Sequence, residues 1–151
     1  MNTWVTSDWH FNHSNIIKYC NRPFKSVSEM NEYIVSEYNR LVQPGDIVYV
    51  LGDIGMGNLD EIIPRLRGNK ILISGNHDKL SVSRYVSIGF SAVLASADVQ
   101  VGRTFVHLRH IPTMSVWRKW KLYLSYIRDM RGKGRSWKVI WQSWQPLSMN
   151  S

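Results

Sequence analysis

Two short apolar stretches constrain the fold of this chain more than any other feature of its sequence. Residues 47–51 read IVYVL, and residues 70–73 read KILI. A run this short, rich in β-branched residues and without polar alternation, is typical of a strand covered on both faces of a parallel sheet. Residues 3–7, TWVTS, alternate well enough to predict another strand.

Helical patterns lie between these predicted strands. Ser26 and Glu29 form an S-x-x-E capping box, and the apolar residues behind it predict an amphipathic helix over 27–42. Shorter helices are expected at 14–20 (ending before Asn21-Arg22-Pro23), 59–66 and 80–87, and further strands at 90–95, 98–101 and 104–108. Strands and helices alternate before a β-rich part, which indicates a layered α/β or α+β fold.

A polar cluster follows the end of each of four predicted strands. The clusters are Asp8-Trp9-His10, Gly52-Asp53, Gly75-Asn76-His77-Asp78 and His110-Ile111-Pro112. Side chains at the carboxyl ends of strands converge on one edge of a layered α/β fold, where ligands bind. Carboxylate, amide and imidazole ligands suit Mn²⁺, Fe, Zn²⁺ or similar divalent ions.

Each cluster also has an ordinary structural explanation. A Gly-Asp pair after a strand is commonly a turn with a capping carboxylate, and Asn-His-Asp is commonly loop chemistry. A D-x-H triplet occurs by chance. The joint occurrence of the clusters, all at strand ends, is what favours a metal site.

These motifs resemble those of the calcineurin-like metallophosphoesterases, whose pattern is D-x-H, G-D, G-N-H-[DE], a later His and a final G-H-x-H. The resemblance covers residues 1–112, and the stretch 7–24 looks most like the small single-domain bacterial and phage members. It implies a layered αββα sandwich, incomplete or altered after about residue 112. It also implies a hydrolase that cleaves phosphomonoesters or phosphodiesters.

The resemblance further implies a binuclear centre. Asp8 and His10 would bind one ion, Asp53 would bridge both, and Asn76 and His110 would bind the other. A bridging carboxylate offsets the repulsion between two close cations, which together lower the pKa of a shared water. Two divalent ions are therefore expected as cofactors, Mn²⁺ first, with Fe, Zn²⁺, Ni²⁺ or Mg²⁺ as alternatives.

Four further residues near the motifs are assigned other roles. By resemblance, His77 would donate to a phosphoryl oxygen or protonate the leaving alkoxide, with Asp78 orienting its imidazole. His13 is either an outer-shell residue or a surface histidine after a turn. His107 is expected to be an ordinary packed or exposed histidine.

The net positive charge of the chain lies almost entirely in its last quarter. Residues 1–112 carry 11 Lys+Arg and 10 Asp+Glu, whereas residues 113–151 carry 8 and 1, together with five of the seven Trp. We therefore expect a phosphoesterase core at 1–112 and an atypical basic, Trp-rich segment at 113–151, with a basic amphipathic helix at 116–131. The alternative function is a nucleic-acid-binding module that uses this segment.

The final G-H-x-H motif of the family is absent, because no His follows His110. Without it each ion loses one protein ligand, so a catalytically inactive phosphoesterase-fold protein is a third interpretation. A frameshift is a second explanation: codons for residues 126–131, read from their third bases, can encode His-Thr-Gly-His-Ala. Under this hypothesis, residues from roughly 113 onward are out of frame.

Two features bear on where the protein acts. Cys20 is the only cysteine, which excludes an internal disulfide and favours a reducing compartment, here the cytoplasm. No apolar run approaches the roughly 18 residues of a membrane span, and no signal-peptide core is apparent, so no membrane partner is expected. The expected partner is a phosphate-ester substrate.

Overall fold

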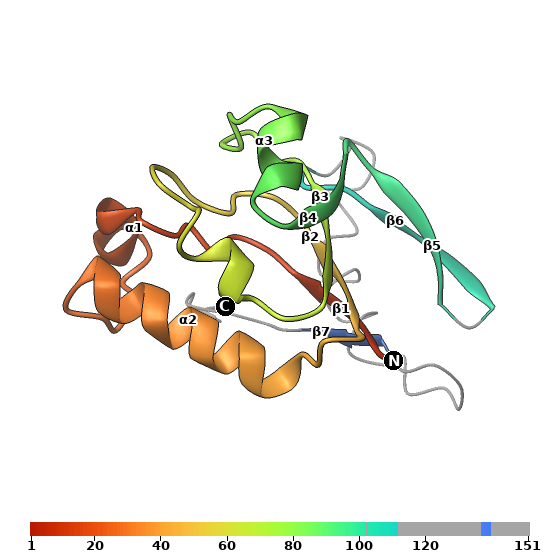
Figure 1. The fold of residues 1–151 in the computed structure, drawn as a ribbon, viewed down its shortest axis with the longest axis horizontal. Helices are drawn as coiled ribbons and strands as arrows, with labels where there is room; N and C mark the ends of the chain where they lie inside the picture. The colour runs from red at the N-terminus through yellow and green to blue at the C-terminus, as the bar shows by residue number, and fades with distance from the viewer. Residues whose placement is uncertain (102, 112–136, 140–151) are drawn as a thin grey trace, which may run out of the picture.

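The computed structural model describes residues 1–101, 103–111 and 137–139 of the chain (Figure 1). A five-stranded parallel sheet forms its centre, in the order β4-β3-β2-β1-β7. Its strands are β1 (Thr3–Thr6), β2 (Ile47–Val50), β3 (Asn69–Ile73), β4 (Phe90–Leu94) and β7 (Trp137–Val139). A second sheet is the antiparallel hairpin of β5 (Ala97–Val101) and β6 (Thr104–Leu108).

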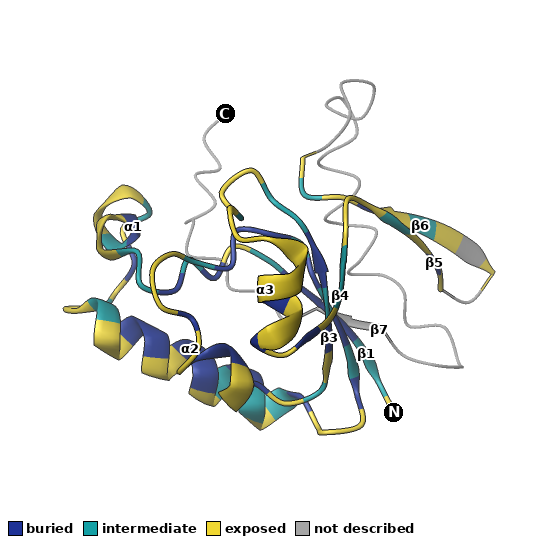
Figure 2. Cartoon of the chain, turned by 45° about the horizontal axis from the view of Figure 1, so that its top comes forward, coloured by how far each residue is buried: buried dark blue, intermediate teal, exposed yellow. Residues whose placement is uncertain are grey.

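Helices and the hairpin lie on opposite sides of the parallel sheet (Figures 1 and 2). The helices are α1 (Ser14–Tyr19), α2 (Val27–Leu41), α3 (Val82–Ser87) and the 3₁₀ helix η1 (Ile63–Arg65). The larger core cluster joins Ile34 and Tyr38 of α2 to Val48 of β2. A smaller cluster joins Ile73 of β3 to Val99 of the hairpin. The predicted layered α/β fold is therefore confirmed.

The longest helix begins at the predicted capping box. The Ser26 side chain accepts a hydrogen bond from the Glu29 N–H at 3.1 Å. The Glu29 carboxylate in turn accepts from the Lys25 N–H at 2.8 Å, one residue before the position a standard capping box uses. Buried side chains then recur along one face of α2, at Met30, Ile34 and Tyr38.

The helix predicted over 59–66 is wrong in extent, because only the 3₁₀ helix η1 forms there. Pro64 has no backbone N–H and cannot bond to the carbonyl of Asp60, as an α-helix through this segment would require. The Asp60 N–H is instead bound by the side chain of Asn58 at 3.0 Å, which favours a turn. The other strands and helices predicted before residue 109 are present, with ends shifted by up to two residues.

Of the residues after 112, the structure describes only those of β7. Its backbone pairs in parallel with β1, Thr3 with Trp137 through Val5 with Val139, and extends the sheet at that edge. The helix predicted at 116–131 and most of the proposed nucleic-acid-binding segment lie outside the described residues. The domain boundary near residue 112 and the frameshift hypothesis stay predictions.

The described helices are all short relative to a bilayer. The longest of them, α2, has 15 residues and one charged and polar face. Within the described ranges, no helix combines the length and the apolar character that crossing a membrane requires.

Candidate metal centre

The polar clusters after β1 and β2 are joined to each other by their backbones. The Asp8 N–H donates to the carbonyl of Gly52 at 3.1 Å, and the His10 N–H donates to that of Asp53 at 3.0 Å. The Phe11 N–H continues the series by donating to Ile54 at 2.9 Å. The parallel pairing of the two strands thus extends through the motifs, and it holds the D-x-H loop against the Gly-Asp loop.

Three ligand-type side chains meet where these two loops lie together. Single ligand atoms of Asp8, His10 and Asp53 all lie within 4.8 Å of one another. The Nε2 atom of His10 is 3.8 Å from a carboxylate oxygen of Asp8 and 3.8 Å from one of Asp53. All three residues have left-handed backbone torsions, with φ of 57°, 52° and 52°. Such torsions cost about 1–2 kcal/mol per non-glycine residue and cluster at functional sites.

Two glycines let the loops after β2 and β3 approach each other. A Cβ atom on Gly75 would lie 2.5 Å from the Asp53 carboxylate and 2.7 Å from its backbone nitrogen. A Cβ on Gly52 would lie 2.6 Å from the Cα of Gly75 and 2.7 Å from Nδ1 of His110. Only glycine fits at either position without moving the backbone. The glycines of both motifs therefore allow the two loops to lie this close together.

The Asp78 carboxylate ties the same two loops together. It accepts hydrogen bonds from the backbone N–H groups of Asp53 at 2.9 Å, Ile54 at 3.0 Å and Gly75 at 2.7 Å. No hydrogen bond joins it to the imidazole of His77. The expected orientation of that ring by Asp78 stays a prediction, while the contacts of Asp78 are those of a loop anchor.

On the other side of Asp53, His110 and Asn76 form a second group of ligand-type atoms. His110 Nδ1 lies 2.7 Å from the Leu51 carbonyl oxygen, an acceptor, so this nitrogen carries the proton of the neutral ring. Its Nε2 then presents a lone pair, 2.9 Å from the Asn76 amide oxygen and 3.5 Å from Asp53 Oδ1. Three candidate ligand atoms therefore lie close together, and in the neutral ring the lone pair of His110 Nε2 faces the two oxygens.

This donor set fits a divalent cation. Lone pairs that converge without a hydrogen repel each other, and a cation between them removes the repulsion. Burial, acting against the nearby carboxylates of Asp53 and Asp8, holds the pKa of His10 below its usual range. The imidazole therefore stays neutral, which is the form that binds a metal.

The remaining predicted histidines have distinct surroundings. His77 is exposed, its backbone N–H donates to the Asp53 carboxylate at 3.2 Å, and its ring centre lies 6.5 Å from that of His10. His13 caps α1, because its Nδ1 accepts from the Ile16 N–H at 3.0 Å. His107 is exposed and pairs with Asp98 across the hairpin at 2.8 Å.

Sequence reasoning missed the groups that support the D-x-H loop from behind. Arg22, predicted only as part of a helix stop, is buried and bonds the Asp8 and Trp9 carbonyls. Asn12 and Asn31 exchange hydrogen bonds between this loop and α2, at 3.2 and 2.8 Å. The signal for Asn31 was a polar residue on the buried face of an amphipathic helix.

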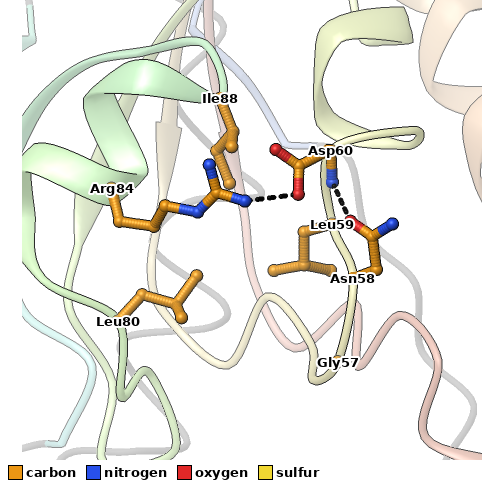
Figure 3. Close-up of a pocket in the computed structure, with 7 residues that line it drawn as sticks. All are labelled: Gly57, Asn58, Leu59, Asp60, Leu80, Arg84 and Ile88. Carbon is orange, nitrogen blue, oxygen red and sulfur yellow. Dashed lines mark hydrogen bonds and ion pairs between the residues drawn. The ribbon is translucent and has the colours of Figure 1, made fainter.

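A pocket opens between the loop after the Gly-Asp motif and α3 (Figure 3). It encloses about 340 Å³. Its lining residues are Gly57, Asn58, Leu59, Asp60, Leu80, Arg84 and Ile88. The Arg84 guanidinium reaches across it to the Asp60 carboxylate at 2.5 Å. In the sequence, residues 57–60 of one wall follow Asp53 closely, and Leu80 of the other wall follows Asp78.

A layered α/β fold with nitrogen and oxygen donors gathered at the carboxyl edge of its sheet defines a class of candidate metal-binding proteins. The chain matches the family model of the calcineurin-like phosphoesterases over residues 1–148 and belongs to that family. The family is one of phosphoesterases, and the group of Asp8, His10 and Asp53 could hold a metal ion.

The chain is similar to proteins from distant sources. It is 47% identical over 81 residues to an uncharacterised protein of Methanocaldococcus jannaschii, covering 50% of this chain and 46% of that protein. It is 30% identical over 132 residues to the gene 66 protein of Mycobacterium phage L5, covering 74% of this chain and 63% of that protein. The matches thus span less than two thirds of either relative.

A solved structure shares the fold. The crystal structure of a protein of unknown function from Aquifex aeolicus superposes with a TM-score of 0.63 and 24% sequence identity. The superposition covers 85% of this chain and 70% of that one. At this identity the likeness supports the fold alone.

Proposed function

We propose that the chain is a phosphoesterase that hydrolyses phosphomonoesters or phosphodiesters with two divalent ions and water. One observation carries the proposal: Asp53 lies between two groups of lone-pair donors. Its Oδ2 faces His10, beside Asp8, while its Oδ1 faces His110, beside Asn76. A carboxylate with one oxygen toward each group is an arrangement that suits a bridging ligand.

Bound ions would supply a water of lowered pKa and positive charge for the phosphoryl oxygens. The residues of the chain would hold and orient them. The Leu51 carbonyl fixes the tautomer of His110, so Nε2 is always the free nitrogen. The Asp78 carboxylate and the two motif glycines keep Asp53 at the junction of the loops.

His77 is proposed as the residue that contacts the substrate. Its imidazole is exposed beside the metal-ligand cluster, while its backbone is fixed to Asp53. An exposed imidazole can donate to a phosphoryl oxygen or to the leaving alkoxide. The proposal leaves His13 out, because its Nδ1 is engaged in capping α1.

The missing G-H-x-H motif limits how tightly the ions would be held. The five proposed ligands Asp8, His10, Asp53, Asn76 and His110 are all that the motifs supply, and no His follows in the sequence. Water would complete the coordination at a cost in affinity, because imidazole contributes both binding energy and geometry. We therefore expect activity only with metal added in excess.

The test is hydrolysis of an aryl phosphate and a bis-aryl phosphate by metal-free protein to which Mn²⁺ is returned. We expect turnover that EDTA abolishes, and a loss of more than about 100-fold for Asp53→Asn and for His77→Ala, because each removes a ligand or a proton donor. Asp53→Asn keeps an oxygen acceptor for the His77 N–H, so its fold should persist.

The matched control is Asp60→Asn, which makes the same chemical change at an exposed carboxylate outside the donor cluster. It should retain wild-type turnover. Equal activity in wild type, Asp53→Asn and His77→Ala would overturn the assignment of the site, and the absence of metal-dependent turnover on both substrates would overturn the activity.

A further inference from the structure

A buried arginine lies behind the D-x-H loop, outside the set of proposed ligands. Arg22 follows α1 and is 6% exposed. Its Nη2 donates to the Asp8 carbonyl and its Nη1 to the Trp9 carbonyl, both at 2.9 Å. The same Nη1 contacts the sulfur of Met30 at 3.3 Å. The Arg22 backbone is itself fixed, because its N–H donates to Ile17 at 2.8 Å.

Burying the Arg22 guanidinium costs the fold free energy. No ion pair joins its guanidinium to a carboxylate within the described ranges, and its buried Nε has no hydrogen-bond acceptor there. Burial lowers its pKa, against the weaker influences of Cys20 and Asp8. Removing a charge from water without an ion pair costs several kcal/mol, and an apolar side chain of similar volume would avoid that cost.

The two carbonyls that Arg22 binds belong to successive peptide groups. They are the groups that join Asp8 to Trp9 and Trp9 to His10. Fixing the planes of both groups fixes the backbone torsions of Trp9 between them, and with these the positions of the Asp8 and His10 α-carbons relative to each other. Both side chains start from left-handed residues, a conformation that a free loop would leave.

We propose that Arg22 is a positioning residue of the metal centre: its two Nη groups hold successive peptide planes of the D-x-H loop, so that Asp8 and His10 reach Asp53. The inference rests on the proposed function, since it assumes that these side chains bind metal. It depends on the planar fork of guanidinium, which offers two donors in fixed directions. The ammonium of lysine is a single point and cannot hold both planes in the same way.

A second buried cation among the described residues offers a matched control. Lys70, at the start of β3, is 5% exposed and donates to two backbone carbonyls, Leu66 at 2.7 Å and Gly68 at 3.2 Å. It therefore has the same burial and the same kind of partners as Arg22. It lies at the opposite end of the parallel sheet from the motifs, so it can affect stability without aiming a ligand.

The experiment measures the Mn²⁺ affinity of the full chain by titration calorimetry and by the electron paramagnetic resonance signal of free Mn²⁺. Wild type, Arg22→Lys, Arg22→Met and Lys70→Met are compared, with urea unfolding as a parallel measurement of stability. We expect Arg22→Lys to stay folded yet bind Mn²⁺ about 10–100-fold more weakly, the usual loss for a residue that orients a ligand. Lys70→Met should keep its Mn²⁺ affinity within about twofold, whichever way its stability changes.

Folded Arg22→Lys with wild-type Mn²⁺ affinity would overturn the positioning role, even if Arg22→Met failed to fold. An equal loss of affinity in Lys70→Met would also overturn it, because the effect would then follow from lost stability. Wild-type protein that binds no Mn²⁺ would instead overturn the proposed function, and with it the inference that rests on it.

Discussion

Each end of the parallel sheet carries a buried aspartate, and the two carboxylates differ in the partners that they contact. At the amino end, the Asp46 carboxylate accepts hydrogen bonds from the Asn2 N–H at 2.6 Å, the Trp4 indole at 2.9 Å and the Gln43 N–H at 3.0 Å. At the carboxyl end, the Asp53 carboxylate accepts a hydrogen bond from the backbone N–H of His77 at 3.2 Å and faces the imidazoles of His10 and His110.

The difference shows what each end is built for. At the amino end, both oxygens of the Asp46 carboxylate accept hydrogen bonds, and the left-handed residue packed against Asp46 is a glycine, Gly68. At the carboxyl end, lone pairs of Asp53, His110 and Asn76 meet one another, and three residues adopt left-handed torsions. We expect an arrangement that is unfavourable by itself to become favourable with a cation in it, and these strained torsions lie at the end where we propose that metal binds.

The largest effect is expected for a methyl group added where the motif loops touch. Gly75→Ala places a Cβ 2.5 Å from the Asp53 carboxylate, so the Gly-Asp and G-N-H-D loops must separate. We expect Mn²⁺ affinity to fall at least about 30-fold and the free energy of unfolding to fall by about 1–3 kcal/mol, the usual cost of overpacking. Calorimetric titration and urea unfolding would measure the two.

Gly45→Ala is the matched control at the amino end, because a Cβ there meets nothing within 4 Å. It should leave Mn²⁺ affinity unchanged and leave stability equal or slightly raised, through a less flexible unfolded chain. Unchanged affinity in Gly75→Ala would break the comparison, since the carboxyl end would then tolerate crowding as well as the amino end does.

A second prediction separates two roles for Asp78. As a loop anchor, Asp78→Asn loses at least one of three backbone hydrogen bonds, because an amide oxygen cannot replace both carboxylate oxygens. We expect about 10-fold weaker Mn²⁺ binding, and a loss of turnover that adds to that of His77→Ala in the double variant. If Asp78 acted only by orienting His77, the double variant would be no worse than His77→Ala.

Asp46→Asn tests the amino end and should affect stability alone. Burial alone would raise the pKa of Asp46, but hydrogen bonds from Asn2, Trp4 and Gln43 lower it to about 2. Because the folded pKa is below the unfolded value, the carboxylate stabilises the fold above about pH 4, and this contribution is lost as the pH falls toward 2. We expect urea unfolding at pH 7 to show a loss of about 1–3 kcal/mol, with Mn²⁺ affinity intact.

The pH dependence supplies the check on this mechanism. The stability difference between wild type and Asp46→Asn should narrow as the pH falls from 4 to 2, because wild type then loses the charge that the variant lacks. A difference that stays constant over this range would mean that Asp46 acts through packing and not through its charge.

The strands and helices of the fold could be predicted from the sequence where a local pattern of residues determines the structure. The apolar run 47–51 had to be a covered strand, and Ser26 with Glu29 had to begin a helix. The same logic brought the motif residues to one edge, because parallel strands share the direction in which they end. That edge is where the structure gathers Asp8, His10 and Asp53.

What the sequence could not predict depends on contacts between distant segments. Nothing local indicates that Arg22 turns inward to two carbonyls, or that the Leu51 carbonyl selects the tautomer of a histidine 59 residues away. Asp78 was expected to contact its sequence neighbour His77, yet its carboxylate bonds a loop 24 and 25 residues earlier. Backbone donors are equivalent in every sequence, so a pattern of side chains does not reveal which of them a carboxylate will reach.

The smallest effect is expected for His107, which lies on β6 three residues before the proposed ligand His110 but has different surroundings. His107 is exposed, and it contacts Asp98 across the hairpin at 2.8 Å. Exposed pairs of this kind contribute about 0–1 kcal/mol, so His107→Ala should change stability by less than about 1 kcal/mol and leave Mn²⁺ affinity unaltered. His110→Ala, three residues away, should lower that affinity at least about 10-fold, because it removes a lone pair fixed toward Asn76 and Asp53. Equal Mn²⁺ affinities in the two variants would mean that the carboxyl edge does not distinguish the half-buried imidazole of His110, held by the Leu51 carbonyl, from an exposed one.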